Sequence, residues 1–327
     1  MTRFRFAAAI VVWCLICRTV TPQDAVPLFQ TGVTVVNVPC VVRERGGSLA
    51  RDLHKDNFEI FDEGKRQEIR YFARQADIPL TLGVLLDISG SVRDIVEREK
   101  RTAASFFRKI LRSNDYGMVT SFADSVRLWQ DFTASVEDLN ASLISVRPVL
   151  GPRPFASDAP QGGTVLYDSI TVTAMEKFRH RAGSKVIVLL SDGLDTNSSV
   201  TLESAIKAAQ ATELIVYSIC DNDPAHEELD AYRRLHRNDA IRFTSGCDAL
   251  RAISEPTGGR MFRIGKNASV EQIFDAIADE IRGQYLLGFS PSKPAREGSF
   301  RKLEIKTKPA GLIVQARKGY YTFKHDE

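Results

Sequence analysis

The sequence predicts an α/β protein whose doubly wound, mostly parallel sheet is inserted into a small β-sandwich-like domain made from both chain ends. The first observation is that continuous apolar runs alternate with amphipathic helical patterns across residues 79–283, as in strands buried on both faces of a parallel sheet. The second is that both chain ends contain short alternating strands separated by turn residues. With 43% hydrophobic and 26% charged residues, the 327-residue chain has the composition of an ordinary globular protein.

The chain opens on a segment typical of an export signal. Arg3 and Arg5 precede an apolar run from Phe6 to Cys17, which is shorter than the roughly 20 residues that a membrane-spanning helix needs. We therefore predict a signal peptide over residues 1–23 and an extracytoplasmic location: periplasmic, in the cell envelope or secreted. An uncleaved membrane anchor and a buried N-terminal element are the alternatives, because no favourable cleavage site follows the run.

Residues 28–76 are predicted to form the first part of the β-rich domain. Apolar and β-branched residues fill positions 33–42, which predicts a strand. Asp62-Glu63-Gly64 predicts a turn between two further strands, at 58–61 and 67–72. These strands are short, and we expect them to pair in antiparallel fashion.

Residues 79–283 carry the pattern of a doubly wound α/β domain. The apolar runs are each bounded by polar residues or glycine, and they lie at Leu82–Leu86, Val186–Leu190 and Leu214–Ile219. Apolar residues at helical spacing predict helices at 103–111, 202–209 and 270–278. Such alternation is typical of a parallel sheet with helices on both faces.

Residues 284–324 are predicted to form the second part of the β-rich domain. Apolar and charged residues alternate from Lys302 to Lys308, and Pro309-Ala310-Gly311 predicts a turn into a strand at 312–314. We therefore expect a half-buried hairpin here. Neither chain end is long enough to form a stable sheet by itself, so we expect the two ends to combine.

Two segments interrupt the alternation. Residues 148–163 are rich in proline and glycine, which predicts a loop, and residues 221–246 form an insertion of mixed charge after the third apolar run. Both segments adjoin strand or helix ends that carry polar residues, so we expect them to border one face of the domain.

The cysteines at the two ends of the insertion allow several interpretations. In an exported protein Cys220 and Cys247 can form a disulfide that closes the insertion and leaves Cys40 unpaired. Two buried free thiols are an alternative. A zinc site that includes His226 and His236 is a further alternative, although the spacing matches no common ligand pattern.

Three polar stretches are placed where chemistry is expected. Asp87-Ile88-Ser89-Gly90-Ser91 follows the first apolar run, Gly162-Gly163-Thr164 precedes a helix, and Ser191-Asp192-Gly193 follows the second run. Because open α/β sheets bind ligands at the carboxyl ends of their strands, we expect these hydroxyls and carboxylates to converge. Local roles are the alternative, since Ser91 with Asp94 can form a capping box and Asp192 can form a turn with Gly193.

In this order the three stretches closely resemble the von Willebrand factor A-type domain and its metal-ion-dependent adhesion site. The resemblance continues outside that domain. Residues 53–72, which contain Asn57-Phe58-Glu59-Ile60-Phe61-Asp62-Glu63-Gly64, and residues 284–321 are similar to the VWFA-related acidobacterial domain family, in which the A-type domain lies between β-rich ends. Residues 149–161 and 221–246 look extended beside the usual loops of that family.

The resemblance implies a divalent-cation site. Ser89, Ser91 and Thr164 would coordinate the ion through hydroxyls, and Asp87 and Asp192 would bind it directly or through water. Oxygen donors without Cys or His favour Mg²⁺, with Mn²⁺ and Ca²⁺ as alternatives. Only two carboxylates face the ion, so an open position remains that a Glu or Asp of an unknown protein ligand can fill.

The predicted function is an exported, metal-dependent protein-binding module of the adhesion type that captures an acidic ligand. Asp168 and Asp195 are expected to be helix-start and turn residues rather than outer ligands. The sequence contains no Gly-x-Ser-x-Gly elbow, His-Glu-x-x-His motif or phosphate-binding loop, so catalysis is not predicted. The alternative is a Mg²⁺-dependent phosphoryl hydrolase with Asp87 as nucleophile.

Two other classes of function are disfavoured. The 44 basic and 41 acidic residues are scattered along the chain, so nucleic acid is not predicted as a partner. Contact with a membrane is expected only through an uncleaved N-terminal segment. A vestigial site is disfavoured because all five positions of the motif carry oxygen-bearing side chains.

Overall fold

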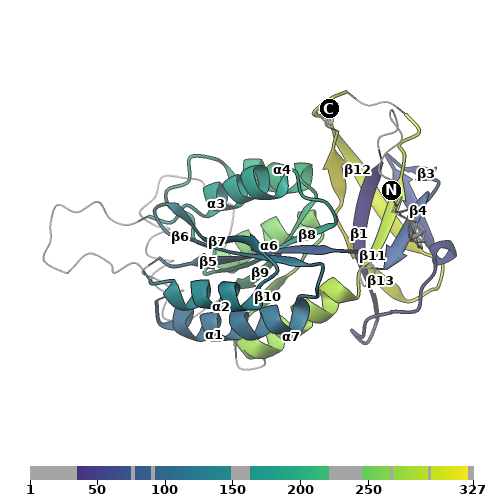
Figure 1. The fold of residues 1–327 in the computed structure, drawn as a ribbon. Coiled ribbons are helices and arrows are strands. Elements are labelled where there is room, and N and C mark those ends of the chain that lie inside the picture. The colour runs from purple at the N-terminus through teal and green to yellow at the C-terminus, as the bar shows by residue number, and fades with distance from the viewer. Residues whose placement is uncertain are drawn as a thin grey trace, which may run out of the picture. The chain divides into compact units, whose positions relative to one another are not determined.

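The computed structural model of the chain describes residues 35–74, 78–89, 93–148, 163–220, 245–265, 268–293 and 296–322 (Figure 1). The predicted signal peptide, Ser91, most of both predicted loops and the histidines of the zinc alternative lie outside these residues. Among the described residues, no helix has both the length and the apolar character needed to cross a membrane.

A six-stranded sheet forms the centre of the predicted α/β domain. In spatial order its strands are β10 (Met261–Arg263), β9 (Leu214–Cys220), β8 (Ser184–Ser191), β5 (Leu80–Asp87), β6 (Tyr116–Phe122) and β7 (Val126–Thr133). All neighbours are parallel except β6 and β7. Every residue of β5, β8 and β9 is buried, which is why these three strands read as continuous apolar runs.

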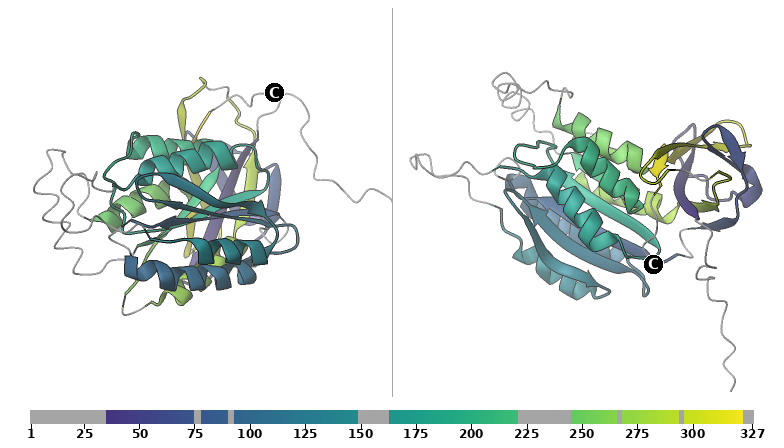
Figure 2. Two further views of the ribbon diagram at one scale, coloured as in Figure 1. Left: turned by 60° about the vertical axis from the view of Figure 1, so that its left-hand side comes forward. Right: turned by 90° about the horizontal axis from the view of Figure 1, so that it is seen from above.

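Helices cover both faces of this sheet, as Figures 1 and 2 show. One face packs against α1 (Arg93–Ile110), α2 (Val136–Ser145) and α7 (Val270–Arg282). The other packs against α3 (Leu166–Val172) with its π-helical continuation (Thr173–Phe178), α4 (Leu202–Ala211) and α6 (Gly246–Thr257). The α/β fold with a mostly parallel, doubly wound sheet is therefore as predicted.

The two chain ends share two further sheets. The first has the order β13 (Leu312–Ala316), β1 (Val36–Glu44), β11 (Tyr285–Phe289), β4 (Tyr71–Arg74). The second has the order β14 (Gly319–Tyr321), β12 (Phe300–Thr307), β2 (Phe58–Asp62), β3 (Lys65–Gln67). Side chains of both sheets contribute to one apolar cluster, and each sheet contains strands from before and after the α/β domain.

The turn at Glu63 and Gly64 joins β2 to β3 as an antiparallel pair, as predicted. Both residues have positive φ, 50° and 74°, which is the conformation that a two-residue hairpin turn with the favoured twist requires. The strand predicted at 67–72 is wrong in one respect, because the chain leaves the second sheet after Gln67 and enters the first at Tyr71.

The hairpin predicted around Pro309-Ala310-Gly311 is also wrong. β12 pairs with β2 and β14, whereas β13 pairs with β1 in the other sheet. Alternation of apolar and charged residues shows that a strand is half-buried, but it does not identify the partner strand. The turn therefore carries the chain from one sheet to the other.

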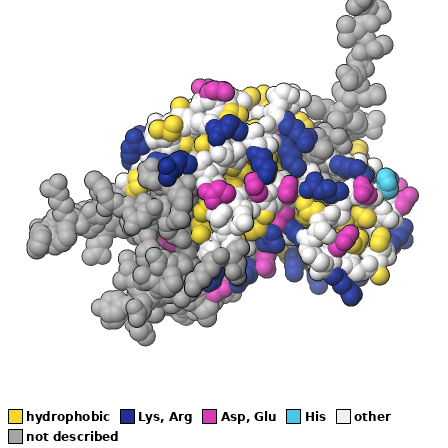
Figure 3. All heavy atoms as spheres, turned by 90° about the horizontal axis from the view of Figure 1, so that it is seen from below, with side chains coloured by type: hydrophobic (Ala, Val, Ile, Leu, Met, Phe, Trp, Pro, Cys, Tyr) yellow, Lys and Arg dark blue, Asp and Glu magenta, His cyan; other side chains and the backbone are white. Residues whose placement is uncertain are grey.

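Buried ion pairs join the β-rich strands to the α/β domain. Glu280 of α7 is 3% exposed and binds both Arg43 of β1 and Arg260, which lies just before β10. Arg317, between β13 and β14, is 5% exposed and lies 3.6 Å from Glu213, which precedes β9. On the face drawn in Figure 3, acidic and basic side chains are interspersed, so that face carries no patch of one sign.

Candidate metal site

Asp87 ends β5 at the carboxyl edge of the six-stranded sheet, and its side chain is almost completely buried, with 1% exposed. One carboxylate oxygen accepts the backbone N–H of Ser89 at 2.9 Å, which folds the loop back over the strand end. The other accepts the hydroxyl of Ser191, the last residue of β8, at 2.7 Å. These two bonds hold the carboxylate in place between the neighbouring strands.

Asp192 directly follows Ser191 and is 5% exposed. Its Oδ1 accepts the N–H of Leu194 at 3.0 Å, whereas its Oδ2 is buried and has no hydrogen-bond partner among the described residues. Burial, and then the negative charge of Asp192, raise the pKa of Asp87 to about 7. The two carboxylates therefore repel each other across the sheet edge.

No Lys, Arg or His of the described residues forms an ion pair with either carboxylate. A buried carboxylate without a partner is costly, and the described residues leave the negative charge of this site unbalanced. Within the described part of the chain no three His, Cys, Asp or Glu side chains gather as a metal cluster, so a cation here would depend on hydroxyls as well as the two carboxylates.

Thr164 is positioned at the same edge by backbone bonds. Its N–H donates to the hydroxyl of Thr196 at 2.7 Å, and its carbonyl accepts the N–H of Thr196 at 3.0 Å. The next residue, Val165, donates to the carbonyl of Ala123 just after β6. The neighbouring carbonyl of Phe122 accepts the N–H of Ile88, so the loop after β5 and the loop before α3 are both attached to the end of β6.

Asp168 and Asp195 tie the loop after β8 to the start of α3, as expected for structural residues. Asp168 accepts the N–H groups of Ser199 and Val200, and Asp195 accepts the hydroxyl of Ser198 at 2.5 Å. Their carboxylates therefore have partners within the loop and order the segment that carries the partner of Thr164.

The disulfide between Cys220 and Cys247 is present, as the disulfide alternative predicted, and Cys40 is free and buried. The bridge joins the end of β9 to the first turn of α6, and Cys220 Sγ lies 4.0 Å from the carbonyl oxygen of Asp192. The turn after Asp192 packs directly against this helix start. A Cβ on Gly193, whose φ is +80°, would lie 2.0 Å from the carbonyl oxygen of Gly246.

The structure thus brings Asp87, Ser89, Thr164 and Asp192 to one edge of the sheet, and Ser91 lies outside the described residues. Sequence reasoning missed the role of Ser191, whose hydroxyl holds Asp87 and also accepts the N–H of Gly193 at 2.9 Å. Its place between an apolar strand and Asp192 was the available indication.

No family model matches the chain, and neither does any curated protein. Solved structures similar to part of it include the conserved hypothetical protein BatB from Bacteroides thetaiotaomicron, with 20% identity, 62% of this chain and 97% of that chain covered, and a TM-score of 0.46. The von Willebrand factor domain of a type V pilus tip protein from Porphyromonas gingivalis matches at 13% identity, with coverage of 62% and 95% and a TM-score of 0.45.

Proximal thread matrix protein 1 from the mussel byssus, solved with a zinc-occupied MIDAS motif, matches at 15% identity over 68% of this chain and 50% of that chain, with a TM-score of 0.48. A von Willebrand factor domain and a protein with a MIDAS motif are thus among the solved structures similar to part of the chain. Matches this remote carry no information on ligand or function.

Proposed function

We propose that the chain is an exported, metal-dependent protein-binding module of the A type, in which residues 79–283 capture an acidic ligand and residues 28–76 and 284–324 form the β-sandwich-like domain that carries them. The observation that supports the metal site is the pair of buried carboxylates, Asp87 and Asp192, without a basic partner among the described residues. In the described part of the chain, Oδ2 of Asp192 is buried and has no hydrogen-bond partner, which fits an atom that would bind a cation.

The donors fit a hard divalent cation. Asp87, Ser89, Ser91, Thr164 and Asp192 offer only oxygen atoms, which suits Mg²⁺ and, after it, Mn²⁺ or Ca²⁺. When bound, the ion supplies a positive charge with an open coordination position. Because the other three donors are neutral hydroxyls, which bind the ion more weakly than carboxylates, a carboxylate of a protein ligand is the natural group to complete its shell.

The environment of Asp87 favours binding over phosphoryl transfer. Both of its carboxylate oxygens are already held, by the N–H of Ser89 and the hydroxyl of Ser191, and its side chain is 1% exposed. A nucleophilic carboxylate needs an accessible oxygen. Metal-dependent hydrolysis of a generic phosphate ester would favour the hydrolase instead.

Calorimetry of the protein with Mg²⁺ alone tests the metal site. We expect Thr164→Ala to weaken Mg²⁺ binding by about tenfold or more, because it removes a ligand hydroxyl from the sheet edge. Thr171→Ala is the matched control, since the Thr171 hydroxyl bonds the carbonyl of Tyr167 within α3. Equal Mg²⁺ affinity of wild type and Thr164→Ala would contradict the site.

Affinity capture from an envelope extract tests the binding role. Proteins retained in Mg²⁺ and released in EDTA are the expected ligands, and Thr164→Ala should retain none of them. Capture that is unchanged in EDTA would show that the cation is not the contact point.

Export is tested separately from binding. A reporter fused after residue 30 should reach the extracytoplasmic side, because Arg3, Arg5 and the apolar run to Cys17 form an export signal. A reporter that stays in the cytosol would overturn this part of the proposal.

A further inference from the structure

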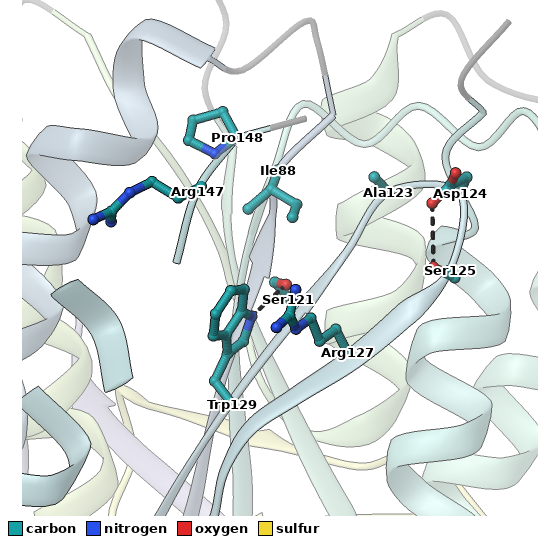
Figure 4. A pocket seen from close by; sticks show the side chains of 9 residues that line it. All are labelled: Ile88, Ser121, Ala123, Asp124, Ser125, Arg127, Trp129, Arg147 and Pro148. Carbon is teal, nitrogen blue, oxygen red and sulfur yellow. Dashed lines mark hydrogen bonds between the residues drawn. The ribbon is translucent and has the colours of Figure 1, made fainter. Parts of the chain in front are cut away.

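A pocket of about 320 Å³ lies beside the candidate metal site at the carboxyl edge of the sheet (Figure 4). One wall is Ile88, which stands between Asp87 and Ser89 in the sequence. The other walls come from the turn between β6 and β7, from the first half of β7 and from the residues after α2. The pocket therefore adjoins the loop that would carry the metal.

Arg127 and Trp129 of β7 provide the recognition chemistry of this pocket. The Arg127 guanidinium lies over the indole ring, 4.0 Å from its centroid, and the indole N–H donates to the buried hydroxyl of Ser121 at 2.7 Å. Figure 4 shows the three side chains together at the base of the pocket. Stacking on the indole restricts the guanidinium to one position. Less conformational entropy of the Arg127 side chain is therefore lost when an anion binds it.

No carboxylate of the described residues pairs with Arg127. The other charged side chains that line the pocket have hydrogen-bond partners. Arg147 donates to the carbonyls of Ile144 and Val146 at the end of α2, and Asp124 accepts the hydroxyl of Ser125 at 3.2 Å across the pocket from Trp129. Of the described residues that line the pocket, Arg127 is thus the cation that has neither a hydrogen bond nor an ion pair.

We propose that this pocket receives a second carboxylate of the acidic ligand whose first carboxylate binds the metal. The inference rests on the proposed function. Phe122 pairs with Asp87 on one side and Val126 on the other, so Arg127 lies two strands from Asp87. Two strand spacings are roughly 10 Å. In an extended peptide of the polyproline II type, which has three residues per turn and rises about 3.1 Å per residue, side chains three residues apart face the same way at roughly this distance. The ligand class is therefore an extended segment of this type with two acidic side chains three residues apart.

Synthetic peptides provide the test. The first probe carries two glutamates three residues apart in an alanine and glycine background, and the second carries one glutamate and one glutamine in the same places. In saturating Mg²⁺ at fixed ionic strength, we expect wild type to bind the first about fivefold more tightly than the second, the size of one exposed charge pair. Arg127→Gln should abolish that difference without changing Mg²⁺ affinity.

Arg181→Gln is the matched control. The Arg181 guanidinium also lies over an aromatic ring, 4.3 Å from the centroid of Phe132, and Arg181 precedes β8, at the amino edge of the sheet. This variant loses the same charge and the same type of stacking, and it should keep the fivefold preference.

The outcomes separate this inference from the proposed function. Absence of Mg²⁺ binding by wild type would overturn both. Metal-dependent binding of both peptides with equal affinity would overturn only the second subsite, as would a preference that persists in Arg127→Gln. A preference lost equally in both variants would show a general effect of net charge and would also overturn the subsite.

Discussion

A buried aspartate lies at each end of strand β5, and the two aspartates differ in their partners. At the start, the N–H of Leu80 donates to Asp115 at 2.7 Å, and the same carboxylate pairs with Arg282 of α7. At the other end, Asp87 accepts the N–H of Ser89 and the hydroxyl of Ser191. Among the described residues, the first aspartate has a basic partner and the second has none, which distinguishes a structural end of the strand from a binding end.

The other buried acidic residues follow the same division. Asp62 pairs with Arg301, and Glu280 pairs with Arg43 and Arg260. Of the five acidic residues buried in the described part of the chain, the two without a basic partner are Asp87 and Asp192. Both lie at the edge where the sequence predicts a cation. The buried acidic residues that lack a basic partner are therefore found together at the candidate metal site.

Removing the arginine from the structural end should have the largest effect. Arg282→Met leaves Asp115 buried without a counter-charge, and we expect the free energy of unfolding to fall by about 4 kcal/mol, with Mg²⁺ affinity unchanged. Urea unfolding measures the loss. Lys109→Met is the control, since Lys109 pairs with Asp275 of α7 in a half-exposed bridge of 2.6 Å and should cost less than about 1 kcal/mol. Equal losses would contradict the distinction.

Near the binding end of the sheet, the disulfide between Cys220 and Cys247 joins β9 to α6. Replacing Cys220 and Cys247 together by alanine should lower the free energy of unfolding by about 3 kcal/mol, because the bridge closes a long segment of chain. It should also weaken Mg²⁺ binding, since Gly246, next to Cys247, packs against the turn after Asp192. Urea unfolding and Mg²⁺ calorimetry, each with and without reductant, measure these effects. Stability insensitive to reductant would show that the bridge contributes nothing.

Binding of Mg²⁺, whose positive charge would balance Asp87 and Asp192, should stabilise the fold. At a Mg²⁺ concentration 100 times its Kd, we expect the free energy of unfolding to rise by about 2.7 kcal/mol, and Asp87→Asn should abolish the rise. Asp168→Asn is the control that separates a ligand from a loop residue, since Asp168 binds only the Ser199 loop. A Mg²⁺ response that disappears in Asp168→Asn would assign that residue to the metal site as well.

Within the six-stranded sheet, sequence patterns identified the strands that are continuously apolar and overlooked those of mixed composition. β5, β8 and β9 are continuous apolar runs, whereas β6 contains Gly117, Thr120 and Ser121, and β7 is a half-exposed edge strand with Arg127 and Gln130. β6 is buried except at Tyr116 and β7 is partly exposed, but both have a mixed composition that shows no clear period. The partners of β12 and β13 also could not be predicted, because pairing depends on contacts between distant parts of the chain.

The candidate metal site also contains residues that could be predicted from the sequence and contacts that could not. Asp87, Ser89, Thr164 and Asp192 could be predicted because each lies next to a strand end or a glycine turn, and their order matches a known arrangement of motifs. The bond from Ser191 to Asp87, and the contact of Gly193 with Gly246, could not be predicted. These contacts join strands and a helix that are separated by more than 50 residues, and neither produces a local pattern.

The smallest expected effect has the opposite sign to that of Arg282→Met. Burial and Asp192 raise the pKa of Asp87 to about 7, above its unfolded value of 3.8, so the ionised form destabilises the metal-free fold as the pH rises through 7. In EDTA at pH 8, Asp87→Asn should therefore unfold with a free energy about 1 kcal/mol higher than wild type, because removal of the buried charge outweighs the loss of a hydrogen bond that the carboxylate accepts. The gain should vanish below about pH 3, where Asp87 is protonated in both states. Urea unfolding at pH 3, 6 and 8 measures it, and a variant less stable than wild type at pH 8 would show that the carboxylate is satisfied without a cation.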